Sequence, residues 1–213
     1  MKTKLCIALM AFIFSNALFA DEKSYTEAMI SAMEQMKISK PADYGLIANQ
    51  FERIAQAEKT EWLPYYYASY VSIIQSYATQ DKSKADEILD YAQKMLDQAA
   101  ILKIDNSENI VLEGFIDCAR IAVDPQRGAE YSQNAIGEFK KAQEIDPLNP
   151  RADYMLGMVL LNTPDFYGGG KKVAQPFFEG AILKFDKFVP LSALHPSWGK
   201  EQCKKQLDSC KQN

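Results

Sequence analysis

A repeated spacing of small and bulky residues constrains the fold of this chain more than any other feature. Three segments carry a small residue, a bulky apolar residue four positions later, and another small residue three positions after that. Spacings of three and four place side chains on one face of an α-helix. Small residues on that face let a second helix approach closely, and the bulky residue fills the space between neighbouring helix pairs. The chain is therefore expected to fold into stacked pairs of helices.

The clearest copy of this spacing is Ala135, Phe139 and Ala142, followed by Pro147 where the helix must stop. Glycine in a preceding helix, as at Gly157, permits the two helices of a pair to cross closely. The residues that we assign to packing between helices are Ala92, Leu96, Ala99, Gly114, Ala135, Phe139, Ala142, Pro147, Leu156, Gly157, Ala174, Phe178 and Ala181.

This spacing resembles the tetratricopeptide (TPR) repeat, over roughly residues 42–187. The phrases "EWLPYYYASY", "PDFYGGGKKVAQPFFEGAI" and "LHPSWGKEQ" resemble a family of exported TPR proteins common in Bacteroidetes-type bacteria. That resemblance covers nearly the whole mature chain. It implies a periplasmic or secreted helical-repeat protein, and the family has no settled molecular function to carry over.

The expected fold is all-α, with about four TPR-like helix pairs in a right-handed superhelix and a C-terminal capping helix. No segment shows the sustained alternation of a β-strand, and apolar residues recur with a helical period instead. The predicted helices span residues 24–37, 42–58, 62–79, 83–102, 107–123, 129–145, 150–162, 172–187 and 196–211.

The first 20 residues have the order of a secretory signal peptide, with lysines, an apolar run and then small residues. The apolar run at residues 5–14 is too short to span a bilayer, which takes about 20 residues. Cleavage after Ala20 or after Ala17 fits the small-residue rule, and the first choice leaves a helical repeat domain at residues 21–213. The sequence thus predicts a periplasmic or secreted protein without a membrane span.

Three cysteines remain in the mature chain, in a compartment that should be oxidising. Cys203 and Cys210 are seven positions apart, which is about 10.5 Å along one helix. That distance is too long for a disulfide. A bridge from Cys118 to either of them stays open, as does the alternative that all three are small apolar side chains.

Composition excludes several classes of function. A net charge of −4 and a pI near 5.2 argue against a nucleic-acid-binding surface. The single histidine, His195, removes multi-histidine metal sites, and Pro196 after it suggests that His195 caps the last helix. We expect no metal, no cofactor and no enzymatic activity. The run "FYGGGKK" lacks the Walker A spacing. It is expected to be a glycine-rich connection, with a weak anion site at the next helix as the alternative.

First helices of stacked pairs line a concave groove. In this chain the groove positions are aromatic and apolar, with one arginine: Tyr66, Tyr70, Ile73, Val111, Phe115, Arg151, Tyr154, Met158 and Asn162. We predict a non-catalytic exported scaffold that binds a protein or peptide there. The alternative is a periplasmic solute-binding or transport-accessory protein that holds an apolar small ligand. In a further possibility the terminal helices fill the groove.

Overall fold

The structure, a computed structural model, describes residues 24–212 and is mainly helical, with no strand among those residues. The predicted signal peptide at residues 1–20 lies outside the described residues. A helix at residues 24–38 precedes the rest of the array. The further helices are α2 (Tyr44–Ala57), α3 (Leu63–Ala78), α4 (Lys82–Leu102), α5 (Ser107–Val123), α6 (Gly128–Ile145), α7 (Pro150–Asn162), α8 (Lys171–Phe185) and α9 (Lys200–Lys211). Short 3-10 helices stand at η1 (Pro41–Asp43), η2 (Pro125–Arg127) and η3 (Asp165–Tyr167).

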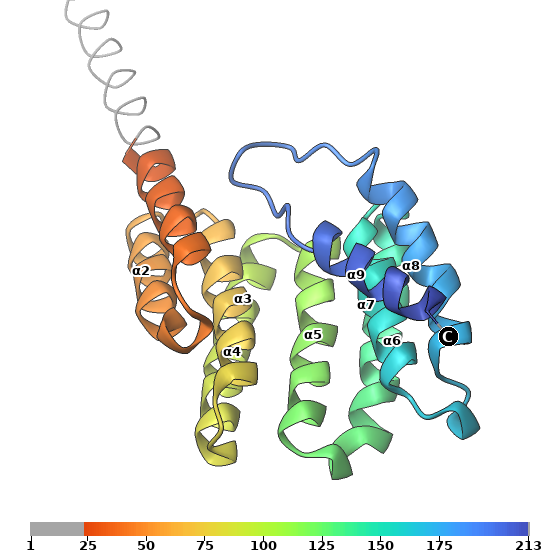
Figure 1. Cartoon of the computed structure of the whole chain (residues 1–213). Coiled ribbons are helices and arrows are strands. Elements are labelled where there is room, and N and C mark those ends of the chain that lie inside the picture. Colours follow the sequence, from red (N-terminus) through yellow and green to blue (C-terminus); the bar gives the residue numbers. More distant parts are fainter. Residues whose placement is uncertain (1–23, 213) are drawn as a thin grey trace, which may run out of the picture.

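The prediction of an all-α fold is confirmed. Successive helices pack side by side as hairpins, with α3 on α4, α5 on α6 and α7 on α8 (Figure 1). The first helices of these hairpins, α3, α5 and α7, also pack on one another and form an inner row. The right-handed superhelix and membership of the TPR superfamily stay predictions.

Two helices of the inner row begin at side-chain caps. The Asn106 side chain accepts hydrogen bonds from the backbone N–H groups of Glu108 and Asn109, at 2.8 and 3.3 Å. The Asn149 side chain accepts one from Arg151 N at 3.0 Å. Such caps satisfy N–H groups that have no partner within the helix. They also fix the backbone positions of Glu108 and Arg151, whose side chains form an ion pair.

The same close packing of glycine and phenylalanine occurs in two successive hairpins. A Cβ atom added to Gly114 would lie 2.5 Å from Phe139 Cε1, and one added to Gly157 would lie 2.7 Å from Phe178 Cε1. Both distances are too short for real Cβ contacts, so only glycine fits there. The residues assigned to helix packing are all buried except Pro147, which is exposed in the turn after α6.

The core consists of two apolar clusters. One is built mainly from α2, α3 and α4, and the other mainly from α6, α7 and α8. Two aromatic side chains, Phe115 of α5 and Trp198, pack against both clusters. Trp198 therefore connects the two halves of the molecule although it lies near the end of the chain.

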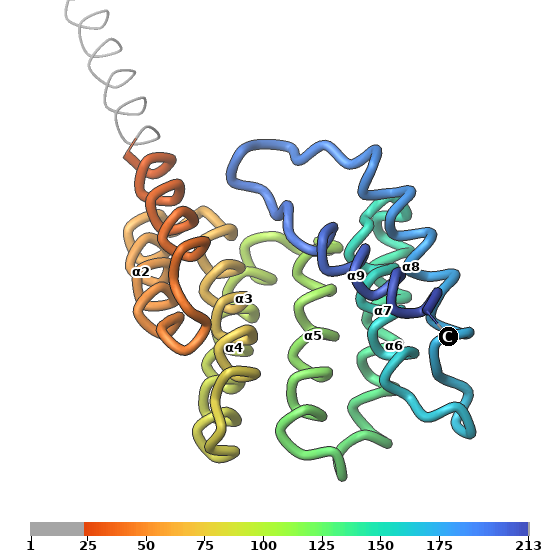
Figure 2. The backbone as a smooth tube through the Cα atoms, viewed as in Figure 1, coloured from red at the N-terminus to blue at the C-terminus, as the bar shows by residue number. Residues whose placement is uncertain are grey.

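The last predicted helix differs from the one observed. α9 begins after Gly199, whose φ is 106°, and not at residue 196. Residues 186–199 form instead an irregular segment, here called the strap, which leaves α8, runs toward the α2–α3 side and turns back to α9 (Figure 2). The prediction that His195 caps the last helix is wrong, because the neighbouring Leu194 is buried against α3 and the helix starts only later.

The three cysteines are unpaired in this structure, so neither bridge from Cys118 is present. Cys203 is buried, and its thiol donates to the Phe178 carbonyl oxygen at 3.6 Å. No helix within residues 24–212 is both long and apolar enough to cross a membrane.

Candidate ligand-binding face

The inner row of helices presents one continuous set of side chains, here called the inner face. It contains every predicted groove residue and two further residues of the same helix faces. Its members are Tyr66, Tyr70, Ile73, Tyr77, Val111, Phe115, Cys118, Arg151, Tyr154, Met158 and Asn162. The strap covers the part of this face around Tyr66, Tyr70 and Arg151, here called the closed half. It leaves the part around Tyr77 and Cys118, here called the open half.

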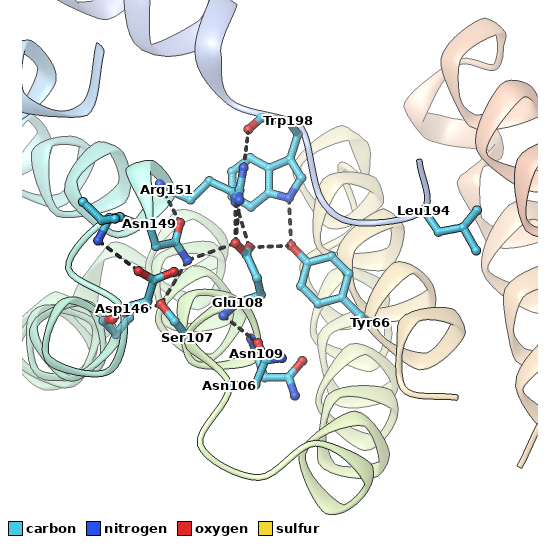
Figure 3. Close-up of polar contacts among 12 residues, drawn as sticks. Tyr66, Asn106, Ser107, Glu108, Asn109, Asp146, Asn149, Arg151, Leu194 and Trp198 are labelled. Atoms are coloured by element: carbon cyan, nitrogen blue, oxygen red, sulfur yellow. Dashed lines mark hydrogen bonds and ion pairs between the residues drawn. The ribbon is translucent and has the colours of Figure 1, made fainter. Parts of the chain in front are cut away.

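An ion pair between α5 and α7 anchors the closed half (Figure 3). Arg151 is 0% exposed, and its guanidinium donates to both carboxylate oxygens of Glu108 over 2.5–3.0 Å. The Asn149 amide and the Tyr66 hydroxyl donate to the same carboxylate, at 3.0 and 3.5 Å. Burial opposes the charge on Arg151, but Glu108 outweighs it and raises the arginine pKa, so the guanidinium stays charged.

The strap is fastened to this ion pair through Trp198. The indole Nε1 donates to the Tyr66 hydroxyl at 2.8 Å, and Arg151 donates to the Trp198 carbonyl oxygen at 3.5 Å. The indole ring stacks between Tyr70, at 5.0 Å between centroids, and Phe115, at 6.0 Å. Farther along the strap, the Tyr67 hydroxyl donates to the Leu194 carbonyl oxygen at 2.9 Å. The strap therefore occupies a stacking position on the inner face.

The predicted groove residues are consequently not equally accessible. Five are buried: Tyr66, Ile73, Val111, Arg151 and Tyr154. Three are partly buried: Tyr70, Phe115 and Met158. Only Asn162 is exposed, at the end of α7. The element that covers the closed half is the non-helical strap, which the sequence did not predict.

The open half begins where the stack of rings reaches solvent. Tyr77 is 50% exposed, and its ring lies 6.0 Å from that of Phe115. Desolvation raises the Tyr77 pKa, and the nearby Cys118 and Tyr154 raise it further. Tyr77 also lines a cavity with residues of α4 and α5. It therefore lies in a concave part of the surface.

Three hydroxyls of the inner face, those of Tyr70, Tyr77 and Tyr154, have no hydrogen-bond partner within residues 24–212. Burial raises the pKa of Cys118 and of Tyr154 to about 12, so both groups are neutral at physiological pH. The open half therefore combines the half-exposed ring and unbonded hydroxyl of Tyr77 with a neutral thiol at Cys118.

A cavity of about 160 Å³ adjoins Tyr77 between α3, α4 and α5. Its lining includes Lys82, Ala119 and Ala122. Pockets for drug-sized ligands usually measure about 300–1,000 Å³. A larger ligand would thus place one edge in this cavity and lie across the open half.

Sequence reasoning missed three residues that lie on this face or bind to it. Tyr77 was detectable, since it follows Ile73 by four positions on the same helix face. Glu108 lies in the first turn of α5, and no spacing rule connects it with Arg151, 43 positions later. Trp198 belongs to an irregular segment and therefore has no periodic pattern at all.

The chemistry of the face does not depend on histidine. His195 Nδ1 lies 2.9 Å from Ser192 Oγ, and its ring packs against Trp62 at 6.0 Å between centroids. No cluster of three or more histidine, cysteine or acidic residues within the described part of the chain could hold a metal ion. The open half offers instead a phenol, a thiol and, at Met158, a thioether beside stacked rings.

The fold and the face together define an all-helical protein whose aromatic inner face is partly covered by its own chain. No family model matches the sequence, and no curated protein matches it either. Among solved structures, the chain is similar to the HusA haemophore from Porphyromonas gingivalis, with 34% identity and a TM-score of 0.80. The match covers 88% of this chain and 92% of that one. The chain belongs to the family of this haemophore.

This relationship corrects the function predicted from the sequence. The main prediction was a scaffold that binds a protein or peptide, and it is wrong because the relative is a haemophore. The alternative prediction, a protein that holds an apolar small ligand, agrees better with that finding. The aromatic pattern of the inner helices suited both classes of ligand and could not separate them.

Proposed function

We propose that this protein binds haem, or a closely related flat tetrapyrrole, on the open half of its inner face and acts as an exported carrier. The observation that carries the proposal is a row of ring contacts. Tyr70, Trp198 and Phe115 are stacked, and Phe115 makes a tilted contact with the half-exposed ring of Tyr77. The haemophore relative supports the choice of ligand. The small molecule, and not a protein, is then the principal partner.

Stacking explains how a flat macrocycle would be held. Offset or tilted aromatic pairs with centroids about 4.5–7 Å apart attract beyond the effect of buried area. The ring of Tyr77 packs on protein at Phe115 and is open to solvent elsewhere. A macrocycle laid on this ring would extend the existing row of rings.

Polar groups around the open half fit the rest of such a ligand. Tyrosine phenolate and cysteine thiolate both serve as axial ligands of haem iron in proteins. The raised pKa of Cys118, and that of Tyr77, mean that the iron would have to displace a proton to form either bond. Most of the affinity is therefore assigned to stacking. Lys82, at the rim of the cavity beside Tyr77, is placed to meet a carboxylate on the ligand.

The remaining sequence predictions fit a carrier. A signal peptide at residues 1–20 would export the chain, and a haemophore acts on haem outside the cytoplasm. An enzymatic role is not proposed, since the only histidine is held by Ser192 and Trp62 away from the open half. The protein would thus bind its ligand unchanged and hand it on.

The test is a titration of the chain from residue 21 with haemin, followed by the Soret band. Wild type should bind with a saturable spectral shift. Tyr77→Ala should weaken binding about tenfold or more, because it removes the exposed end of the stack. Tyr77→Phe keeps the ring, so it should retain most of the affinity if stacking dominates.

Tyr131→Ala is the matched control, because Tyr131 lies on α6 and outside the inner face. It should bind haemin as wild type does. An unchanged Soret band on addition of wild-type protein would refute haem binding. Equal affinities for wild type and Tyr77→Ala would refute the proposed site while leaving the ligand class intact.

A further inference from the structure

The turn between α7 and α8 carries an exposed pair of aromatic side chains. Phe166 is 79% exposed and Tyr167 is 75% exposed, and their ring centroids are 4.2 Å apart. Single exposed apolar residues are common on protein surfaces and need no explanation. Two adjacent aromatic rings at the tip of a turn are different, and Figure 1 shows this turn projecting from the α7–α8 hairpin.

The turn holds these rings outward by its own structure. Gly168 and Gly170 have φ angles of 84° and 95°, which other residues rarely adopt. Gly170 N donates to the Leu160 carbonyl oxygen at 2.8 Å, which fastens the turn to the end of α7. A side chain at Gly169 would collide with the Thr163 carbonyl oxygen. These features fix the course of the backbone at the turn that carries the two exposed rings.

Lysines surround the aromatic pair, although the whole chain has a net charge of −4. Lys171 and Lys172 follow the turn directly and are exposed. Lys171 Nζ donates to the Gln212 carbonyl oxygen at 3.2 Å, so the end of α9 with Lys211 lies beside the turn. The nearest acid, Asp165, has its carboxylate against Gly170 at the start of α8.

We propose that this corner docks on a membrane surface that contains anionic lipids. The corner consists of Phe166, Tyr167, Lys171, Lys172 and Lys211. Aromatic rings are favoured at the boundary between headgroups and acyl chains, and lysines are attracted to anionic headgroups. No described helix could cross the membrane, so this attachment is peripheral.

The shape of the corner favours a bilayer over a protein partner. A stable protein interface buries about 800 Å² on each side and needs an extended complementary surface. Two rings on a projecting turn give a small convex tip, which a soft lipid surface accommodates by insertion. The inference is independent of the haem proposal, because the corner shares no residue with the inner face.

The experiment is co-sedimentation of the chain from residue 21 with vesicles of phosphatidylcholine, with and without phosphatidylglycerol. Wild type should bind the mixed vesicles, and added sodium chloride should weaken that binding. Phe166→Ser with Tyr167→Ser should reduce the partition coefficient about tenfold. Lys171→Glu with Lys172→Glu should reduce it by roughly the same factor and remove most of the salt dependence.

The control is Val189→Ser with Leu191→Ser in the strap, where both side chains are more than 80% exposed but lie outside the corner. This variant should bind vesicles as wild type does, and circular dichroism should show all variants folded. Absence of wild-type binding to the mixed vesicles overturns the proposal. So does unchanged binding of the Phe166/Tyr167 variant.

Discussion

The two halves of the inner face come from the same three helices and differ in what satisfies their polar groups. In the closed half, Glu108 accepts bonds from Arg151, Asn149 and Tyr66, and Trp198 completes the set. In the open half, the hydroxyls of Tyr77 and Tyr154 have no partner among the described residues. In the closed half the polar groups are paired within the protein, whereas those of the open half are available to a bound molecule.

The difference shows that an aromatic face alone does not locate a binding site. Both halves are rich in rings, and the rings even form one row of contacts across the boundary. The strap converts the closed half into core, where buried polar groups stabilise the fold only while they stay paired. Changes in the closed half should therefore affect stability first, and changes in the open half should affect ligand binding first.

Breaking the buried ion pair should give the largest effect on stability. Arg151→Ala leaves the Glu108 carboxylate without its main partner in a largely buried position. The free energy of unfolding should fall by about 3–5 kcal/mol, measured by urea denaturation. Arg151→Met combined with Glu108→Met should recover most of that loss, because no charge is then buried unpaired. Lys84→Ala breaks a fully exposed pair with Glu87 and should leave stability unchanged. A small effect of Arg151→Ala would mean that the closed half is not core.

Removing the ring that joins the halves should have an intermediate effect. Trp198→Ala deletes an indole that stacks on Tyr70 and Phe115 and donates to Tyr66. Unfolding free energy should fall by about 2 kcal/mol, since the side chain is only partly buried. Haemin should still bind, because Tyr77 stays in place and Tyr70 becomes more accessible. Loss of haemin binding in this otherwise folded variant would instead assign the ligand to the strap.

The smallest effect concerns the pH dependence of the strap. Burial lowers the pKa of His195 below its usual 6.5; Glu108 opposes this shift and Lys103 adds to it. Because the folded-state pKa is lowered, the stabilisation is present above about pH 6.5 and is lost as the pH falls through the lowered value. The change should be roughly a few tenths of a kcal/mol for this partly exposed ring. His195→Gln should remove that part of the pH dependence, as compared with wild type in urea titrations across this range. Identical pH profiles for the two proteins would contradict the assignment.

The spacing of neighbouring residues in the sequence predicted most of the fold but little of the candidate site. Helices α3 to α8 begin and end within about two residues of their predicted bounds, because caps, prolines and a helical period act between near neighbours. The close contacts of Gly114 with Phe139 and of Gly157 with Phe178 follow from the same repeated spacing.

The strap could not be predicted in this way. Its contacts join residues that are 127 and 132 positions apart, and an irregular segment leaves no period in the sequence. Pro196 fits the first turn of a helix, and the sequence alone could not show that Leu194 is buried instead. The sequence could not predict the class of ligand either, because aromatic rings in a groove can bind both peptides and flat small molecules.

The position of the strap in the chain sets the order in which the molecule is completed. The hairpins need only neighbouring segments, so each can form as soon as its own two helices have been synthesised. Leu194 and Trp198 follow all three hairpins in the chain, and until they are in place Tyr66, Tyr70 and Phe115 have nothing from the strap over them. A newly made chain therefore passes through a stage at which more of its aromatic surface is uncovered than in the folded protein.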